Sequence, residues 1–151
     1  MNKTTQEETN KATLLKLIET GFNKGDLSVV SQVVAEDSME HQRGNHDGIQ
    51  GTKEVITTLR SWFPDFSMRM EDVSASGDMV WMRFKATGTN LGSVMNNPPT
   101  GKKMAIDVID IVRFRDGKIV EHWGVPDQLG MMLQLGLIGG KGAVRRSPDQ
   151  P

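Results

Sequence analysis

The stretch Met104–Asp127, MAIDVIDIVRFRDGKIVEHWGVPD, decides how this chain folds, because it reads as two β-branched strands on either side of Asp116-Gly117. The interior of such a hairpin should be apolar. It nevertheless contains Asp107, Asp110 and His122 within otherwise buried-looking sequence. A carboxylate buried without a partner costs several kcal/mol, so each of these groups needs compensation.

The length of the turn determines whether Asp110 meets His122, since a change of one residue swaps every side chain to the other face. A two-residue loop would place Ile111 opposite His122. A three-residue loop, Arg115–Gly117 with Gly117 left-handed, would place Asp110 opposite His122, and we favour this second arrangement. It predicts one face with Val108, Asp110, Val112, Val120, His122 and Gly124, and the other with Ile109, Ile111, Arg113, Ile119, Glu121 and Trp123.

An aspartate and a histidine facing each other in an apolar cavity could transfer protons, because the carboxylate fixes the imidazole tautomer and raises its basicity. The alternative is that Asp110 and His122 only satisfy each other, in the core or at a dimer interface. A metal site made of His41, Asp110 and His122 is conceivable. The chain lacks the close helical ligand spacing of zinc sites, and we therefore expect no metal.

Two further strands, both upstream of this hairpin, complete a sheet. Period-two alternation predicts strands over Phe66–Val73 and Met79–Thr89, followed by Lys103–Arg115 and Ile119–Val125. The Pro- and Asn-rich stretch Leu91–Lys102 cannot pair in a ladder and is predicted to be a loop. The result is a four-stranded antiparallel meander.

The amino-terminal half has helical periodicity instead. Apolar residues at helical spacing predict helices ending at Phe22, over 27–34 with Asp26 as the cap, and from Thr52 to a stop at Pro64. The segment 39–51 is predicted to be a short strand leading into a loop. Three amino-terminal helices packed on a curved antiparallel sheet make a cone-shaped α+β fold whose open end is a pocket.

The chain has 151 residues, the usual size of one domain. We expect a frayed segment over 1–11, one domain over 12–138 and a flexible tail over 139–151. A short helix is predicted after Pro126-Asp127, where Asp127 can act either as the cap or as a site residue.

Composition excludes several classes of function. The net charge is −1, with 18 Lys and Arg against 19 Asp and Glu, so we expect neither nucleic acid nor membrane as a partner. The absence of cysteine excludes disulfides, thiolate metal sites and cysteine nucleophiles. No apolar run is long enough to span a bilayer and the first residues are polar, so we expect a cytoplasmic protein. The 10 methionines suggest either an irregular apolar pocket or simply a methionine-rich core.

Several ordered motifs within residues 12–136 resemble one family. They are Phe22–Asp26, Glu40-His41, Gly48–Gly51, Phe63–Asp65, Pro98–Gly101 and Asp110–Asp127. Together they resemble the SnoaL-like polyketide cyclases, also called ester cyclases, of the nuclear-transport-factor-two-like superfamily. The resemblance implies a cofactor-free intramolecular aldol condensation on a polyketide ester, in a hydrophobic cavity within each subunit of a homodimer or homotetramer.

One position departs from the pattern that the resemblance implies. The acid/base Asp of the characterised cyclases lies two residues after the histidine that matches His122, where this chain has Gly124. Asp110 falls where those cyclases have another pocket histidine. An acid is therefore supplied from a neighbouring position.

These observations lead to a cyclase or isomerase in which Asp110 and His122 are catalytic and a small hydrophobic carbonyl compound is the substrate. One alternative is a non-catalytic binder of small hydrophobic molecules. Another is hydrolysis of an epoxide or ester by an activated water. The predicted substrate-binding residues are His41 near the entrance, Trp62, Phe63, Met82, Phe84 and Val108 in the walls, and Asp127.

Overall fold

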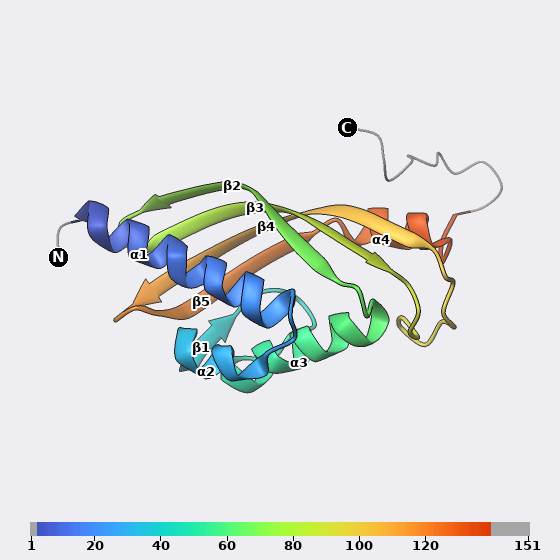
Figure 1. The fold of residues 1–151 in the computed structure, drawn as a ribbon, viewed down its shortest axis with the longest axis horizontal. Helices are drawn as coiled ribbons and strands as arrows, with labels where there is room; N and C mark the ends of the chain where they lie inside the picture. The colour runs from blue at the N-terminus through green and yellow to red at the C-terminus, as the bar shows by residue number, and fades with distance from the viewer. Residues whose placement is uncertain (1–2, 140–151) are drawn as a thin grey trace.

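The computed structural model describes residues 3–139 and shows helices packed on one face of a curved, five-stranded sheet (Figure 1). The strand order is β1-β5-β4-β3-β2. The strands are β1 Val34–Glu40, β2 Ser67–Ser76, β3 Met79–Thr89, β4 Lys103–Arg115 and β5 Lys118–Pro126. The α+β class and the meander β2-β3-β4-β5 are confirmed.

The meander forms because its residues alternate between a buried and a solvent-facing side. In β3, Val80, Met82, Phe84 and Ala86 are buried, whereas Trp81 lies on the opposite, exposed side. The same alternation continues in β4, where the inner residues pack against the helices. The concave face of the sheet and the inner sides of the helices therefore share one core.

The strand β1 differs from the expected second helix. The helical part is only Leu27–Val29 (η2) and Val30–Val33 (α2), with Asp26 capping it through a hydrogen bond from Ser28 N of 2.9 Å, as predicted. From Val34 the backbone is extended and pairs in parallel with β5. The open edge of β5 supplies this segment with hydrogen-bond partners, so the sheet has a fifth strand.

The remaining helices are α1 Lys3–Lys16, its π-helical continuation η1 Leu17–Phe22, α3 Gly48–Trp62 and α4 Gln128–Leu135. The segment 3–11 is therefore helical, although we expected a frayed end up to residue 11. The helix α3 also begins before Thr52, the predicted start. The expected tail lies outside the described residues except for Gly139. Within residues 3–139, no helix combines the length and apolar character that a bilayer crossing requires.

The turn between β4 and β5 has two residues, and the predicted three-residue loop is wrong. Asp116 and Gly117 both have positive φ, +52° and +75°, and they pair Arg115 with Lys118. This is the backbone twist that favours tight hairpins, and glycine adopts it without steric cost. A two-residue turn by itself would place Ile111 opposite His122.

A β-bulge at Val120 changes that register. Phe114 pairs with Ile119 but Arg113 pairs with Glu121, so Val120 is the extra residue on β5. Beyond the bulge, Val112 pairs with His122 and Asp110 with Gly124, as the ladder of β4 and β5 shows. Asp110 and His122 therefore share the inner face, but as diagonal neighbours rather than as a direct pair. Ile119, expected on the outer face, is buried on the inner one.

Candidate active site

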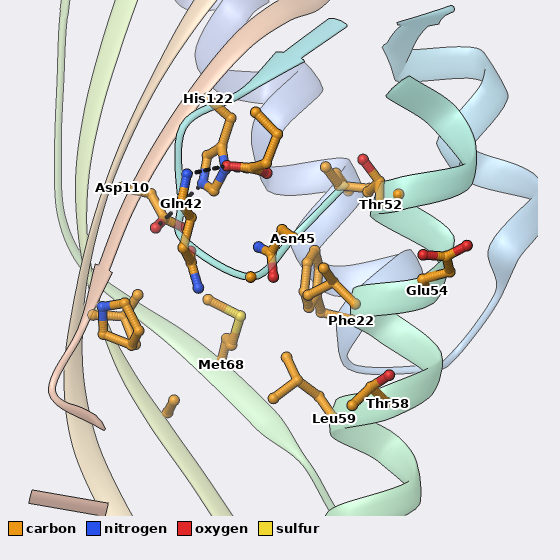
Figure 2. A pocket seen from close by; sticks show the side chains of 18 of the residues that line it. Phe22, Gln42, Asn45, Thr52, Glu54, Thr58, Leu59, Met68, Asp110 and His122 are labelled. Carbon is orange, nitrogen blue, oxygen red and sulfur yellow. Dashed lines mark hydrogen bonds and ion pairs between the residues drawn. The ribbon is translucent and has the colours of Figure 1, made fainter. Parts of the chain in front are cut away.

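A cavity of about 590 Å³ lies between the concave face of the sheet and the helices. Its walls are mostly apolar, with Met82, Val108 and Val112 from the sheet. Phe22 and Leu59 approach from η1 and α3 on the other side (Figure 2). Such a concave apolar space with a few polar groups is the usual form of a small-molecule site.

Asp110 and His122 come together at the polar end of this cavity. The distance from His122 Nε2 to Asp110 Oδ1 is 3.4 Å, and the Asp110 side chain is only 13% exposed. Among residues 3–139, Asp110 Oδ1 has no hydrogen-bond partner, since 3.4 Å is an ion-pair distance rather than a close hydrogen bond. Catalytic contacts are often long without substrate and tighten when it binds.

A second carboxylate contacts the other side of the His122 ring. Glu40 Oε1 and Oε2 lie 2.9 and 2.8 Å from His122 Nδ1. The parallel pairing of β1 with β5 places Glu40 directly opposite His122, and Gln42 N donates a hydrogen bond of 2.7 Å to Glu40 Oε1. Glu40 was not predicted as a site residue, although the Glu40-His41 motif contains it.

The two carboxylates determine the charge of His122. Burial disfavours the charged ring, but the 3.4 Å contact with Asp110, the hydrogen bonds to Glu40 and the charges of both carboxylates outweigh burial and raise the pKa of His122 to about 10. The two carboxylates therefore favour the imidazolium form of His122. Two carboxylates and one imidazolium give this cluster a net charge of −1.

Gln42 occupies the space beside Gly124. A Cβ atom on residue 124 would overlap Gln42 Oε1 and would lie 3.0 Å from Asp110 Oδ1. Figure 2 shows Gln42 next to Asp110, on the sheet side of the cavity. The absence of a side chain at position 124 therefore makes room for Gln42 next to the acid.

His41 faces away from the cavity, and its predicted place at the entrance is wrong. Its ring stacks on Trp123, with centroids 4.7 Å apart, and Nε2 lies 2.8 Å from Glu121 Oε1 on the outer side of the sheet. Successive residues of a strand point to opposite faces, so Glu40 faces inward and His41 outward. The three residues considered as a metal site, His41, Asp110 and His122, are consequently not brought together.

The predicted wall residues divide into two groups. Trp62, Met82 and Val108 line the cavity. Phe63 and Phe84 are fully buried in the core instead, because Phe63 packs against the backbone of Gly88 and Phe84 is enclosed on the inner side of β3. Asp127 also lies outside the cavity, and its side chain accepts a hydrogen bond of 2.8 Å from Gly130 N at the start of α4.

Further lining residues come from segments that were predicted to be loops. The segment 42–46 between β1 and α3 forms part of the rim, where His46 Nδ1 lies 2.7 Å from Glu54 Oε2. The hydrogen bond and charge of Glu54 raise the pKa of His46. Within residues 3–139, five methionines line the cavity, namely Met68, Met82, Met95, Met104 and Met131. The methionine content therefore reflects a pocket at least in part.

Comparison with known proteins agrees with this architecture. The family model described as SnoaL-like polyketide cyclase matches residues 12–135. The aklanonic acid methyl ester cyclase DauD of Streptomyces sp. (strain C5) is 25% identical over 82% of this chain and 80% of its own. The nogalonic acid methyl ester cyclase of Streptomyces nogalater is 27% identical over 76% of this chain and 89% of its own.

A solved structure gives the same result. IdmH of Streptomyces antibioticus, a candidate polyketide cyclase, is similar to this chain with a TM-score of 0.76 and 32% identity, over 84% of this chain and 98% of IdmH.

Proposed function

Because this chain belongs to the SnoaL-like polyketide cyclase family, we propose that it closes a ring in a hydrophobic polyketide ester, with Asp110 and His122 as its acid/base pair. The observation that carries this proposal is the position of the Asp110 carboxylate. It lies in an apolar cavity, 3.4 Å from His122, with Oδ1 free of hydrogen bonds within residues 3–139.

The proposed reaction is an intramolecular aldol condensation. The pair takes a proton from a carbon next to a carbonyl, and the resulting enolate attacks a second carbonyl of the same molecule. One carbon–carbon bond forms, and the proton returns to the new alkoxide oxygen. No net oxidation occurs, so Asp110 and His122 need to supply only proton transfer.

The family resemblance implies a catalytic acid at position 124, which is glycine in this chain. Another residue can nevertheless bring a carboxylate to the same place. Asp110 is the cross-strand partner of Gly124, and its Oδ1 lies 3.0 Å from the point where a Cβ of residue 124 would be. A carboxylate reaches this point from β4 instead of β5. This geometry supports Asp110 as the substitute for the family acid.

The net negative charge of the site favours an uncharged substrate. Glu40 and Asp110 outnumber the single imidazolium of His122, so a free carboxylate at this end of the cavity would be repelled. A methyl ester removes that charge. The names of the two curated cyclases compared above refer to methyl esters, and we propose the same substrate class here.

Turnover of aklanonic and nogalonic acid methyl esters tests the proposal. Asp110→Asn and His122→Gln should each lower kcat/KM by about a hundredfold or more. Asp107→Asn is the matched control, because Asp107 lies on the same strand but pairs with Lys85 on the outer face, at 2.8 Å. Unchanged rates in both site variants would overturn the assignment.

A non-catalytic ligand-binding protein is the second candidate. The position of Gln42 next to Gly124 favours it, since an amide rather than an acid fills that space. In this case the purified protein would bind the esters and form no product. Ligand affinity would then survive Asp110→Asn.

We further propose that the protein is a cytoplasmic homodimer or homotetramer. No helix within the described residues covers the outer face of the sheet, where Trp81, Ile109 and Val125 are 38, 50 and 68% exposed. Light scattering should show a dimer or tetramer that Ile109→Glu weakens. A wild-type monomer at micromolar concentration would contradict this assembly.

A further inference from the structure

We infer that Glu40 is a positioning residue that keeps both nitrogens of His122 protonated, so that Asp110 rather than the imidazole accepts the proton from substrate carbon. The assignment of the proton acceptor rests on the proposed function. The protonation of the resting ring does not, because it follows from contacts within the protein.

The contact between Glu40 and His122 is fixed by the sheet. Residues 40 and 122 are partners in the parallel ladder of β1 and β5, and His41 N donates a hydrogen bond of 2.9 Å to His122 O. Gln42 N holds Glu40 Oε1 from the other side, at 2.7 Å. The Glu40 side chain is 13% exposed, so water competes little for its oxygens.

The hydrogen-bond partners of His122 determine which of its ring nitrogens carry a proton. A carboxylate accepts hydrogen bonds and has no proton to donate, so Nδ1 must donate to Glu40. On the opposite side Nε2 faces Asp110 Oδ1, which is a second acceptor. A neutral ring would leave a lone pair on Nε2 pointing at that oxygen, whereas an imidazolium satisfies both sides.

Other charged side chains around the cavity do not change which groups contact the His122 ring. Arg43 and His46 lie in the loop after β1, and Glu54 lies on α3. Glu54 is paired with His46, at 2.7 Å. Asp110 from β4 and Glu40 from β1 are therefore the charged groups that contact His122.

This arrangement gives Asp110 and His122 different roles in the reaction. An imidazolium has no lone pair with which to take a proton, whereas Asp110 Oδ1 makes no close hydrogen bond within residues 3–139 and, as a carboxylate oxygen, keeps a lone pair for a proton besides its contact with His122. Asp110 takes the proton from carbon and later returns it to the alkoxide oxygen. His122 holds Asp110 in place and balances its charge, and Glu40 keeps His122 in the form that can do so.

Nuclear magnetic resonance of histidine-labelled protein tests the inference without substrate. The chain has 3 histidines, so each ring can be assigned by substitution. We expect His122 to show two protonated nitrogens at pH 7.5 in the wild type. Glu40→Gln should lower its titration midpoint by about one pH unit or more, because a charged acceptor is lost.

The matched control is Glu121→Gln, which removes a carboxylate from His41 on the outer face and should leave His122 unchanged. A neutral His122 in the wild type at pH 7.5, or an unchanged midpoint in Glu40→Gln, would overturn the inference. The wild-type measurement can overturn the inference even if the variant fails to fold.

Kinetics separates this inference from the proposed function. In Glu40→Gln, the pH profile of kcat should gain an inflection between pH 6 and 9 that the wild type lacks, as His122 loses its second proton. Absence of any cyclised product with a doubly protonated His122 would refute the proposed reaction alone. Normal turnover with a neutral ring would refute the role of Glu40 alone.

Discussion

Asp110 and Gly124 are direct partners across the β4–β5 ladder, and Gln42 fills the space that a side chain at position 124 would occupy. The carboxylate, the glycine and the amide thus depend on one another. A substitution at any one of these three positions should displace the side chains at the others.

Gly124→Ala should disturb the acid without changing the fold. The added methyl group would overlap the end of the flexible Gln42 side chain and lie 3.0 Å from Asp110 Oδ1. We expect kcat/KM to fall between about tenfold and a hundredfold through misplacement of the acid. The double variant Gly124→Ala/Gln42→Ala should recover part of this loss, and an equal or larger loss would contradict the steric explanation.

The neighbouring residues Trp62 and Phe63 should respond differently to truncation. Phe63 is fully buried in the core, so Phe63→Ala should lower the free energy of unfolding by about 3–5 kcal/mol. Trp62 lines the cavity, and Trp62→Ala should weaken ligand binding while lowering stability less. Urea unfolding and calorimetric titration measure the two effects, and identical stability losses would argue against this distinction.

Asp127→Ala should affect stability rather than catalysis. Asp127 caps α4 through Gly130 N, and loss of such a cap costs about 1 kcal/mol. Asp127→Ser keeps a capping oxygen and should retain most of the stability. A large fall in kcat for both variants at unchanged stability would instead restore Asp127 to the substrate site.

The stability of the protein should depend on pH through His122. The pKa of His122 is raised to about 10 in the folded state from an ordinary value of 6.5. Between these two pH values the folded protein keeps a proton on His122 that the unfolded chain loses. The stabilisation is complete below pH 6.5 and is lost as pH rises through about 10. Urea unfolding should show this decline in the wild type and a shallower one in His122→Gln, whereas parallel curves would contradict it.

Local patterns predicted the meander because side chains in β3 and β4 alternate strictly between the core and the outside. They also predicted that Asp110 and His122 share a face. The reason given was wrong, however, since a bulge at Val120 rather than a longer turn restores the parity. A bulge leaves no distinct mark in a β-branched sequence such as Lys118–Val120.

The contact between Glu40 and His122 could not be predicted in the same way. It joins residues far apart in the chain through a parallel pairing, and the first residues of β1 follow directly on a predicted helix over 27–34. Once β1 is known to be a strand, alternation alone places Glu40 inside and His41 outside. A short strand was predicted to begin near Met39, but without its pairing to β5 the sequence does not tell which of Glu40 and His41 faces the cavity.

The bulge at Val120 also determines where this hairpin tolerates changes in length. Extra residues at the exposed tip, between Asp116 and Gly117, would lengthen the loop and leave the ladder below it intact. Deleting Val120 while keeping the tight turn would remove the bulge and leave the register unchanged, because Ile119, Glu121 and His122 would still pair with Phe114, Arg113 and Val112. Sequence drift or engineering can therefore lengthen the tip or remove the extra residue of the bulge, and His122 would keep its place on the inner face of the sheet.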